Sequence, residues 1–245
     1  MGRVRDTNED AFVSDPDMRL FVVADGMGGH NAGEVASQLA IETITAFIRR
    51  STSDTDLSWP YGIDQTLSWD GNRLRTAIHL ANRRVFRAAE ATDSYSGMGT
   101  TVVGLMVNGD RVSVGHVGDS RLYLFSHGDL EQVTHDDSWA AAVLAQDPNL
   151  GPHDIARHPM RNVLTNVLGA RDQVEIHLTE RPLKGGEMML LSSDGLHGAL
   201  DATAIRDILA DAQAVDVAAR RLVDAALDRG SRDNVTAVVV RYDAD

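Results

Sequence analysis

The sequence contains no cysteine, which excludes disulfides, zinc sites built on cysteine and enzymes with a thiolate nucleophile. It also lacks long apolar runs: stretches such as 20–24 and 188–191 are far too short to cross a bilayer. No charged segment followed by an apolar one opens the chain, so we expect neither a signal peptide nor a membrane anchor. A cytoplasmic location is the simplest expectation.

Basic residues are scarce relative to acidic ones, with 23 Lys and Arg against 36 Asp and Glu and a formal net charge of −13. Because such a chain repels nucleic acid and anionic membranes, we expect neither as a partner. The surplus of acid is explained either by a solvated surface or by cation sites. Composition leaves both explanations open, whereas the positions of the acids can separate them.

The size and composition, 245 residues with 43% hydrophobic and 24% charged, are typical of one soluble domain. Apolar runs predict strands at 20–24, 101–107, 111–117, 121–125, 188–191 and 235–242. Apolar residues at helical spacing predict a helix of about four turns after Asn31 and further helices over 74–88 and 215–226. Strands and helices segregated in this way indicate an α+β fold.

Two segments show no periodicity. Residues 51–70 are polar and predict a surface loop. Residues 139–170 contain Pro148, Pro152 and Pro159 and predict a small irregular subdomain between strands. A connection of that length inside a compact domain more often has a function than serves only to join two strands.

Acidic residues stand at the ends of predicted strands rather than on helix faces. These acids are Glu9, Asp10, Asp25, Asp119, Asp194 and Asp233. Glycine follows both Asp25 and Asp194, which permits a sharp turn and leaves a carbonyl free to coordinate. One such pair alone usually marks a turn, but carboxylates that meet raise one another's pKa or require a cation. Oxygen ligands without cysteine indicate magnesium or manganese.

Six motifs occur in order along nearly the whole chain: RDTNED (5–10), ADGMGGH (24–30), GMGTT (97–101), GDSR (118–121), SDG (193–195) and SRDN (231–234). Together they closely resemble the motifs of bacterial type 2C (PPM family) metal-dependent serine/threonine protein phosphatases. The resemblance implies a four-layer α-β-β-α sandwich, in which two antiparallel sheets are flanked by paired helices. It implies one catalytic domain over 1–245, with a flap subdomain at about 137–170.

The resemblance also implies two Mg²⁺ or Mn²⁺ ions, with a third in a weaker site, that activate a water molecule. Asp25 would bridge two ions, one of them also held by the Gly26 carbonyl and the other by Asp194 and Asp233. A third ion would be shared by Asp119 and Asp194. Glu9 and Asp10 would act directly or through water.

Arg5 resembles the family's phosphate-binding arginine, whose planar fork can grip two phosphate oxygens. Taken alone, Arg5 has an equal alternative, a surface ion pair with Asp6 or Glu9. In the flap, Ser138 and Asn162 are candidate contacts, the latter near the third ion.

Three departures from the family pattern stand out. Met27 occupies the position where many eukaryotic members carry a histidine proposed as the general acid, and we interpret the nearby His30 as solvent-exposed or capping. Residues 136–138 read Asp-Asp-Ser where Asp-His-Ser is common. The first motif begins almost at Met1, so we expect a shortened edge strand.

These expectations favour hydrolysis of phosphoserine and phosphothreonine in proteins. One alternative is a pseudophosphatase that serves as a binding or regulatory module, which would be expected to lack a bridging acid or Arg5. Another is a metallohydrolase of nucleotides or small phosphate esters. Phosphorylated proteins are the expected partners, a cognate serine/threonine kinase is expected by analogy, and we expect a monomer.

Overall fold

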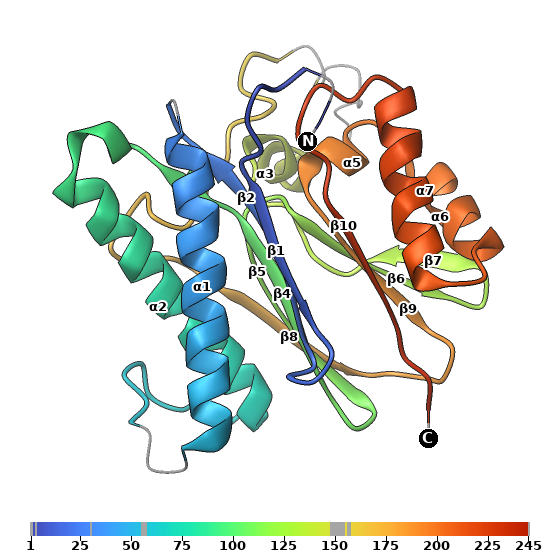
Figure 1. Ribbon diagram of the computed structural model, residues 1–245, viewed down its shortest axis with the longest axis horizontal. Helices are drawn as coiled ribbons and strands as arrows, with labels where there is room; N and C mark the ends of the chain where they lie inside the picture. The colour runs from blue at the N-terminus through green and yellow to red at the C-terminus, as the bar shows by residue number, and fades with distance from the viewer. Residues whose placement is uncertain are drawn as a thin grey trace.

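Two antiparallel β-sheets packed face to face form the centre of the protein (Figure 1). The computed structural model describes residues 2, 4–29, 31–54, 58–147, 155 and 158–244. One sheet has the order β1-β2-β4-β5-β8, with β3 paired to β2, and the other has the order β10-β9-β6-β7. The strands of the first sheet are β1 (Asp10–Asp15), β2 (Leu20–Met27), β3 (Gly99–Thr100), β4 (Val102–Asn108), β5 (Arg111–Val117) and β8 (His177–Pro182). Those of the second are β6 (Arg121–Ser126), β7 (Asp129–Gln132), β9 (Met188–Ser192) and β10 (Ala237–Arg241).

A pair of helices covers the outer face of each sheet (Figure 1). Helices α1 (Ala32–Ser53) and α2 (Trp69–Ala91) pack on the first sheet, and α6 (Ala202–Asp211) and α7 (Val215–Asp228) pack on the second. The other helices within the described ranges are short: η1 (Asp93–Tyr95), α3 (Trp139–Gln146) and α5 (Asp194–His197). The predicted four-layer α-β-β-α sandwich is therefore confirmed.

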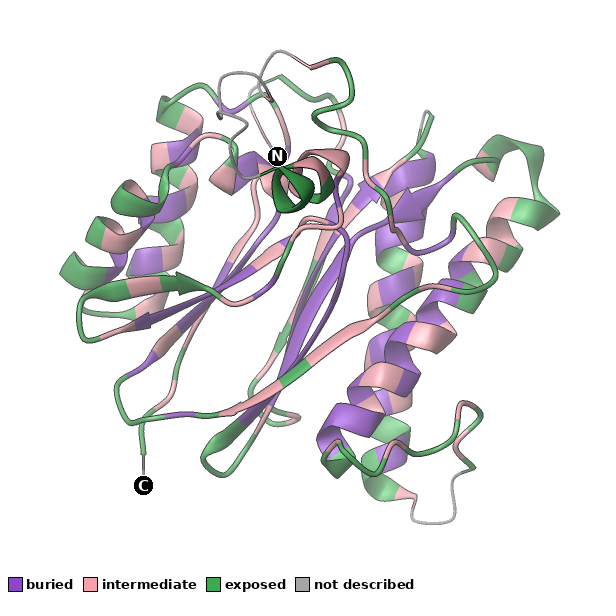
Figure 2. Ribbon diagram, turned by 180° about the vertical axis from the view of Figure 1, so that it is seen from behind, coloured by how far each residue is buried: buried purple, intermediate pink, exposed green. Residues whose placement is uncertain are grey.

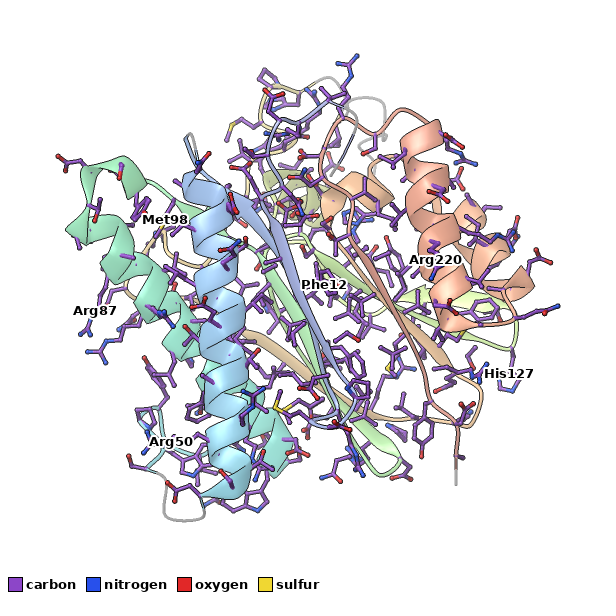
Figure 3. All side chains as sticks on the ribbon, viewed as in Figure 1. Phe12, Arg50, Arg87, Met98, His127 and Arg220 are labelled. Carbon is purple, nitrogen blue, oxygen red and sulfur yellow. The ribbon has the colours of Figure 1, made fainter. Side chains whose placement is uncertain are left out.

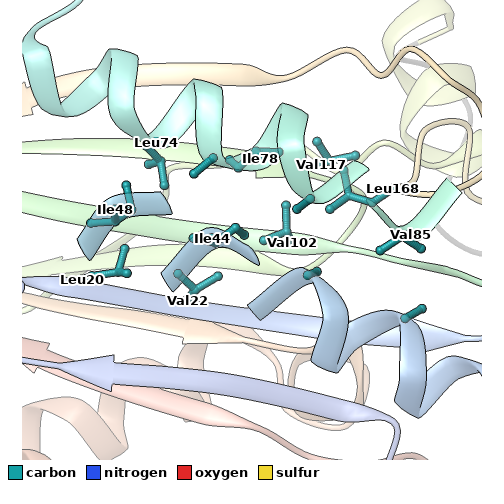
Figure 4. Packing of buried hydrophobic residues seen from close by; sticks show 14 of the residues in the cluster. Leu20, Val22, Ile44, Ile48, Leu74, Ile78, Val85, Val102, Val117 and Leu168 are labelled. Atoms are coloured by element: carbon teal, nitrogen blue, oxygen red, sulfur yellow. The ribbon is translucent and has the colours of Figure 1, made fainter. Parts of the chain in front are cut away.

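Three apolar layers hold the four structural layers together, and buried residues concentrate in the sheets and on the inner faces of the helices (Figure 2). Between the first helical pair and its sheet, Ile44 and Ile48 of α1 and Ile78 of α2 are fully buried around Leu20 and Val22 of β2 (Figure 4). A second cluster fills the space between the sheets, and a third lies under α6 and α7. Burial of these side chains is the main source of stability in a fold of this kind.

Several predicted boundaries were wrong. The segment 51–70 is not a loop throughout, because α1 continues to Ser53 and α2 begins at Trp69. Helix α1 has 22 residues, longer than the predicted four turns. Strand β8 and helix α6 were not predicted. The residues of β8 are half-buried or exposed, so its sequence shows no clear alternation of apolar and polar residues. Helix α6 buries only Ile205 and Leu209, one turn apart, so its apolar pattern is short.

None of the helices in the described ranges combines the length and the hydropathy that crossing a membrane requires.

Candidate metal centre

The carboxylate of Asp10 lies where the two sheets meet at one end of the sandwich. Asp10 stands directly opposite Asp25 in the register of β1 and β2. From the second sheet, the hydroxyl of Ser193 donates to Asp10 Oδ2 at 2.8 Å, and that of Thr236 donates to the same oxygen at 2.7 Å. Acids from distant parts of the sequence are thus brought to one edge, as the strand-end pattern predicted.

Asp25 is positioned by the segment that follows β3. Its backbone N–H donates to the Thr101 hydroxyl at 3.1 Å, and its carbonyl accepts from the Thr101 N–H at 2.9 Å and from the Thr100 hydroxyl at 2.8 Å. Burial raises the pKa of Asp25 well above its usual range, and the charges of Asp10 and Asp194 raise it further. The group is therefore costly to ionise unless a cation is near.

The pKa values of two more acids in the cluster are also raised. Burial, followed by the charge of Asp233, raises the pKa of Asp194 to about 6. Burial, followed by the charge of Asp194, raises the pKa of Asp119 to about 7. Asp119 lies in the turn between β5 and β6. Carboxylates from five separate segments therefore repel one another within a small volume.

Two buried oxygens in this cluster lack a hydrogen-bond partner among the described residues, Asp10 Oδ1 and Asp194 Oδ1. Buried polar atoms are almost always paired, and buried charges need a counter-charge. Oxygen-only donors with unpaired carboxylates fit a hard divalent cation. Within the described ranges no three acidic or histidine side chains already enclose one common ion position, so side-chain adjustment would accompany cation binding.

Arg5 lies at the rim of the cluster, where its side chain is 48% exposed. Its Nη2 donates to Asp233 Oδ2 at 2.8 Å, and its Nη1 lies 3.7 Å from Glu9 Oε2. The hydrogen bond with Asp233 is the main factor that raises the pKa of Arg5. The guanidinium thus pairs chiefly with a predicted metal ligand rather than with Asp6, and it remains open to an anion from solvent.

The backbone around Glu9 is fixed by Asn234, which precedes the last strand. The Glu9 N–H donates to Asn234 Oδ1 at 2.8 Å, and Asn234 Nδ2 donates to the Thr7 carbonyl at 3.0 Å. Glu9 is buried, and burial raises the pKa of its carboxyl. The two acid-bearing ends of the chain are therefore joined through one amide side chain.

Close backbone approaches explain two of the motif glycines. A Cβ at Gly26 would lie 2.0 Å from the Gly33 carbonyl oxygen, and one at Gly195 would lie 1.9 Å from the Asn234 carbonyl oxygen. Neither backbone can move aside without displacing the start of α1 or the segment that contains Asp233. Only glycine fits at these positions.

Asp136 and Asp137 form ion pairs and hydrogen bonds where the predicted flap begins. Arg121 forms a two-point ion pair with Asp136, from Nε to Oδ1 at 2.8 Å and from Nη2 to Oδ2 at 2.7 Å. Asp137 accepts from the Gly118 N–H at 3.0 Å, from Asn166 Nδ2 at 2.8 Å, and lies 2.9 Å from His177 Nε2. Asp137 therefore joins the turn that bears Asp119 to Asn166 and His177.

The two predicted flap contacts have different surroundings. Ser138 caps α3, since its hydroxyl accepts from the Ala141 N–H at 3.2 Å. Asn162 is exposed in a turn, and no hydrogen bond joins it to the carboxylates in the described part of the chain. Roles for Ser138 and Asn162 toward substrate or a third ion stay predictions. His30 and the flap positions 148–154, 156 and 157 lie outside the described residues.

His197 directly follows the cluster in α5, but it is not suited to act as an acid. Burial lowers its pKa to about 3, so the ring is neutral at physiological pH. Its Nδ1 lies 3.2 Å from the Ser192 hydroxyl.

Sequence reasoning missed the polar side chains that orient the acids, namely Thr101, Ser193, Asn234 and Thr236. Three of them belong to the quoted motifs, and all lie within three residues of a carboxylate or across a strand from one. Hydroxyl and amide groups next to strand-end acids could have indicated this role, because buried carboxylates need donors.

Clustered carboxylates and an arginine at one end of an α-β-β-α sandwich are the combination expected of a metal-dependent phosphatase. The family model described as protein phosphatase 2C matches residues 3–230, so the chain belongs to the protein phosphatase 2C family.

Relatives of known structure and sequence agree with this assignment. The chain is 31% identical over 242 residues to the serine/threonine phosphatase stp of Listeria welshimeri serovar 6b, covering 98% of this chain and 92% of that protein. The crystal structure of the Mycobacterium tuberculosis serine/threonine phosphatase PstP/Ppp superposes with a TM-score of 0.83 at 35% identity, covering 99% and 95% of the two chains. The catalytic domain of PstP in complex with two manganese ions gives a TM-score of 0.79 at 36% identity, covering 97% and 93%.

Proposed function

We propose that this protein is a serine/threonine protein phosphatase that hydrolyses phosphoserine and phosphothreonine in proteins with Mg²⁺ or Mn²⁺. The observation that carries the proposal is the pair of unpartnered buried oxygens, Asp10 Oδ1 and Asp194 Oδ1, in a carboxylate cluster beside Arg5. The names of the relatives and the manganese in one related structure support it.

The residues that would hold the ions are Asp25, the Gly26 carbonyl, Asp194 and Asp233, with Glu9 and Asp10 acting partly through water and Asp119 serving a third ion. When bound, such ions lower the pKa of a water molecule and offset the charge of the phosphate. Asp25 senses the charges of both Asp10 and Asp194, so it is the acid best placed to serve two ions.

Arg5 would bind the phosphate of the substrate. Its guanidinium already faces the cluster and keeps half of its surface open to solvent. Two N–H groups in a plane can hold two phosphate oxygens and orient the phosphorus for attack in line with the leaving oxygen. Exchange of Asp233 for a phosphate would also release one carboxylate oxygen toward a cation.

The hydroxyls around Asp10 would hold that carboxylate in one orientation. Ser193 and Thr236 both occupy Oδ2, so the unpartnered Oδ1 is the atom directed at an ion or its water. Removal of such supporting donors typically lowers metal affinity tenfold or more.

A pseudophosphatase is the less favoured alternative, because every predicted acid and Arg5 is retained and the relatives are named as phosphatases. A hydrolase of nucleotides or small phosphate esters would use the same centre. The test is a comparison of a phosphothreonine peptide with ATP and a small aryl phosphate, each with Mn²⁺ and after chelation. Preference for the peptide supports the proposal, and preference for ATP would replace it.

We further propose that residues 1–245 act as one catalytic domain, with 137–170 as its flap. Phosphorylated proteins would be the substrates, a cognate serine/threonine kinase would supply them, and the enzyme would act in the cytoplasm as a monomer. Gel filtration and co-purification with candidate kinases would test these points.

A further inference from the structure

A groove lined by arginines runs between the outer faces of α1 and α2. Its volume is about 510 Å³, and its lining includes Phe47, Arg50, Leu80, Arg83, Arg84 and Arg87. Arg50 lies toward the end of α1 and Arg87 on the outer side of α2, in the helical layer opposite Arg220 of α7 (Figure 3). Four arginines gathered on one seam form a local positive field on a chain whose formal net charge is −13.

Two of these arginines are not neutralised by the protein itself. Arg84 pairs with Glu42 at 3.1 Å, and Arg50 lies 3.9 Å from Asp54. Arg83 and Arg87 are exposed, and neither has an acidic partner in the ranges that the structure describes. They are one helical turn apart, so their like charges slightly destabilise α2. A ligand of opposite charge would remove that repulsion.

A cluster of aromatic side chains adjoins the groove at Phe47. Phe47 lines the groove and packs edge-on against Trp59, with ring centroids 6.1 Å apart. Trp59 in turn contacts Trp69 at 5.7 Å, and Trp69 is 61% exposed. Tryptophan and arginine are the residues most enriched at the centres of protein interfaces. An aromatic cluster that ends in the exposed Trp69 therefore adjoins the arginine-lined groove.

We propose that this groove docks an acidic segment of a protein partner, with one large apolar residue of that segment packed against Phe47 and Trp69. The charge balance favours a short acidic segment over nucleic acid or an anionic membrane. Ions screen charges beyond about 8 Å at physiological salt, so a short ligand senses mainly the arginines. A polyanion that extends over the surface would meet the acidic remainder of the chain.

The groove is separate from the carboxylate cluster. Phe47 lies fifteen positions after Ala32, where α1 starts beside the cluster, which corresponds to about 20 Å along the helix. A partner docked here leaves the phosphate site open, and changes in the groove leave hydrolysis of a small phosphate ester unaltered.

The test measures binding by fluorescence anisotropy, so it does not depend on catalysis. The probe is a short fluorescein-labelled peptide of glutamate and aspartate around one central phenylalanine. The variant Arg83→Glu/Arg87→Glu reverses the stripe, and Arg220→Glu/Arg221→Glu on α7 makes the same charge change on the opposite helical layer. Melting temperatures and hydrolysis of a small aryl phosphate establish that both variants are folded.

We expect the peptide to bind the natural protein, with at least tenfold weaker binding in the α2 variant and unchanged binding in the α7 variant. Trp69→Ala should weaken binding of this peptide but not of one without phenylalanine. Absence of binding, or equal loss in both double variants, overturns the proposal. Preferential binding of single-stranded DNA or of phosphatidylserine vesicles, lost in the α2 variant, also overturns it, because the partner would then be of another class.

Discussion

The hydroxyl of Ser193 donates a hydrogen bond to Oδ2 of Asp10 at 2.8 Å, although 183 positions separate the two residues in the chain. Ser193 follows β9 in one sheet, and Asp10 begins β1 in the other. The bond therefore joins the sheets at the carboxylate cluster and leaves Asp10 Oδ1 without a partner in the described structure. The packing of the sandwich and the arrangement of the acids depend on each other at this point.

Substitution of Ser193 should weaken metal binding without removing a ligand. In Ser193→Ala, Thr236 alone holds Asp10, and we expect Mn²⁺ affinity to fall about tenfold and stability to fall by about 1 kcal/mol. Calorimetric titration and thermal unfolding measure the two effects. Ser14→Ala, at an exposed position of β1, is the matched control. Equal metal affinity in Ser193→Ala and the natural protein would show that the bond is only structural.

The stability of the chelated protein should fall as pH rises. Asp194 and Asp119 have folded-state pKa values of about 6 and about 7, above the value of 3.8 expected in the unfolded chain. The folded state therefore holds protons that the unfolded state releases, so this stabilisation is complete below pH 4 and is lost as pH rises through 7. The expected loss for the cluster is on the order of 1 kcal/mol or more.

Urea unfolding with chelator at pH 5, 6, 7 and 8 measures this trend, after comparison with the same series in saturating Mn²⁺. The cation should reverse the trend, because it binds the ionised carboxylates of the folded state only. Identical pH profiles with and without the ion would be inconsistent with a cation site at these acids.

Substitution of Arg5 should act mainly on substrate binding. In Arg5→Ala the guanidinium that faces the cluster is lost, and KM for a phosphothreonine peptide should rise more than kcat falls. Arg5→Lys keeps the charge but not the planar fork, so its KM should lie between that of the natural protein and that of Arg5→Ala. Steady-state kinetics with one phosphothreonine peptide measure kcat and KM for the natural protein and both variants. A large fall in kcat with an unchanged KM refutes the assigned role.

Substitution of Asp119 should impair turnover more than it impairs cation binding at the principal metal sites. Its carboxyl lies in the β5–β6 turn and senses Asp194, but no hydrogen bond ties its side chain to Asp10 or Asp25 in the described residues. In Asp119→Ala we expect kcat to fall at least tenfold while the tight phase of a Mn²⁺ titration is retained. Loss of the tight phase would place Asp119 among the principal ligands instead.

The sequence predicted the parts of the fold that depend on buried, strongly patterned segments. Strands β2, β4 and β9 are nearly continuous apolar runs, and α2 keeps its apolar stripe along the whole predicted range. Strand β8 and helix α6 escaped prediction because each is held by its neighbours: β8 by its pairing with β5, and α6 by two buried side chains. Local pattern is weak where tertiary contacts decide the structure.

The candidate site was predictable as a set of acids but not as a set of contacts. Strand-end position identified Asp25 and Asp194, since strands of one sandwich end at shared edges. Arg5 pairs with Asp233, which is 228 positions away, and no local sequence pattern indicates this contact. The same holds for the contacts of Asp137 with Asn166 and His177. Such contacts depend on how loops from separate strands fold over one another.

If Asp10, Asp25, Asp194 and Asp233 together hold divalent cations, a calorimetric Mn²⁺ titration of chelator-treated protein will detect them. The natural protein should bind at least two ions per chain. Asp25→Asn keeps the shape of the side chain but not its charge, and it should lose tight binding while it stays folded. Tight binding that is unchanged in Asp25→Asn, or no binding by the natural protein, would rule out this carboxylate cluster as the cation site.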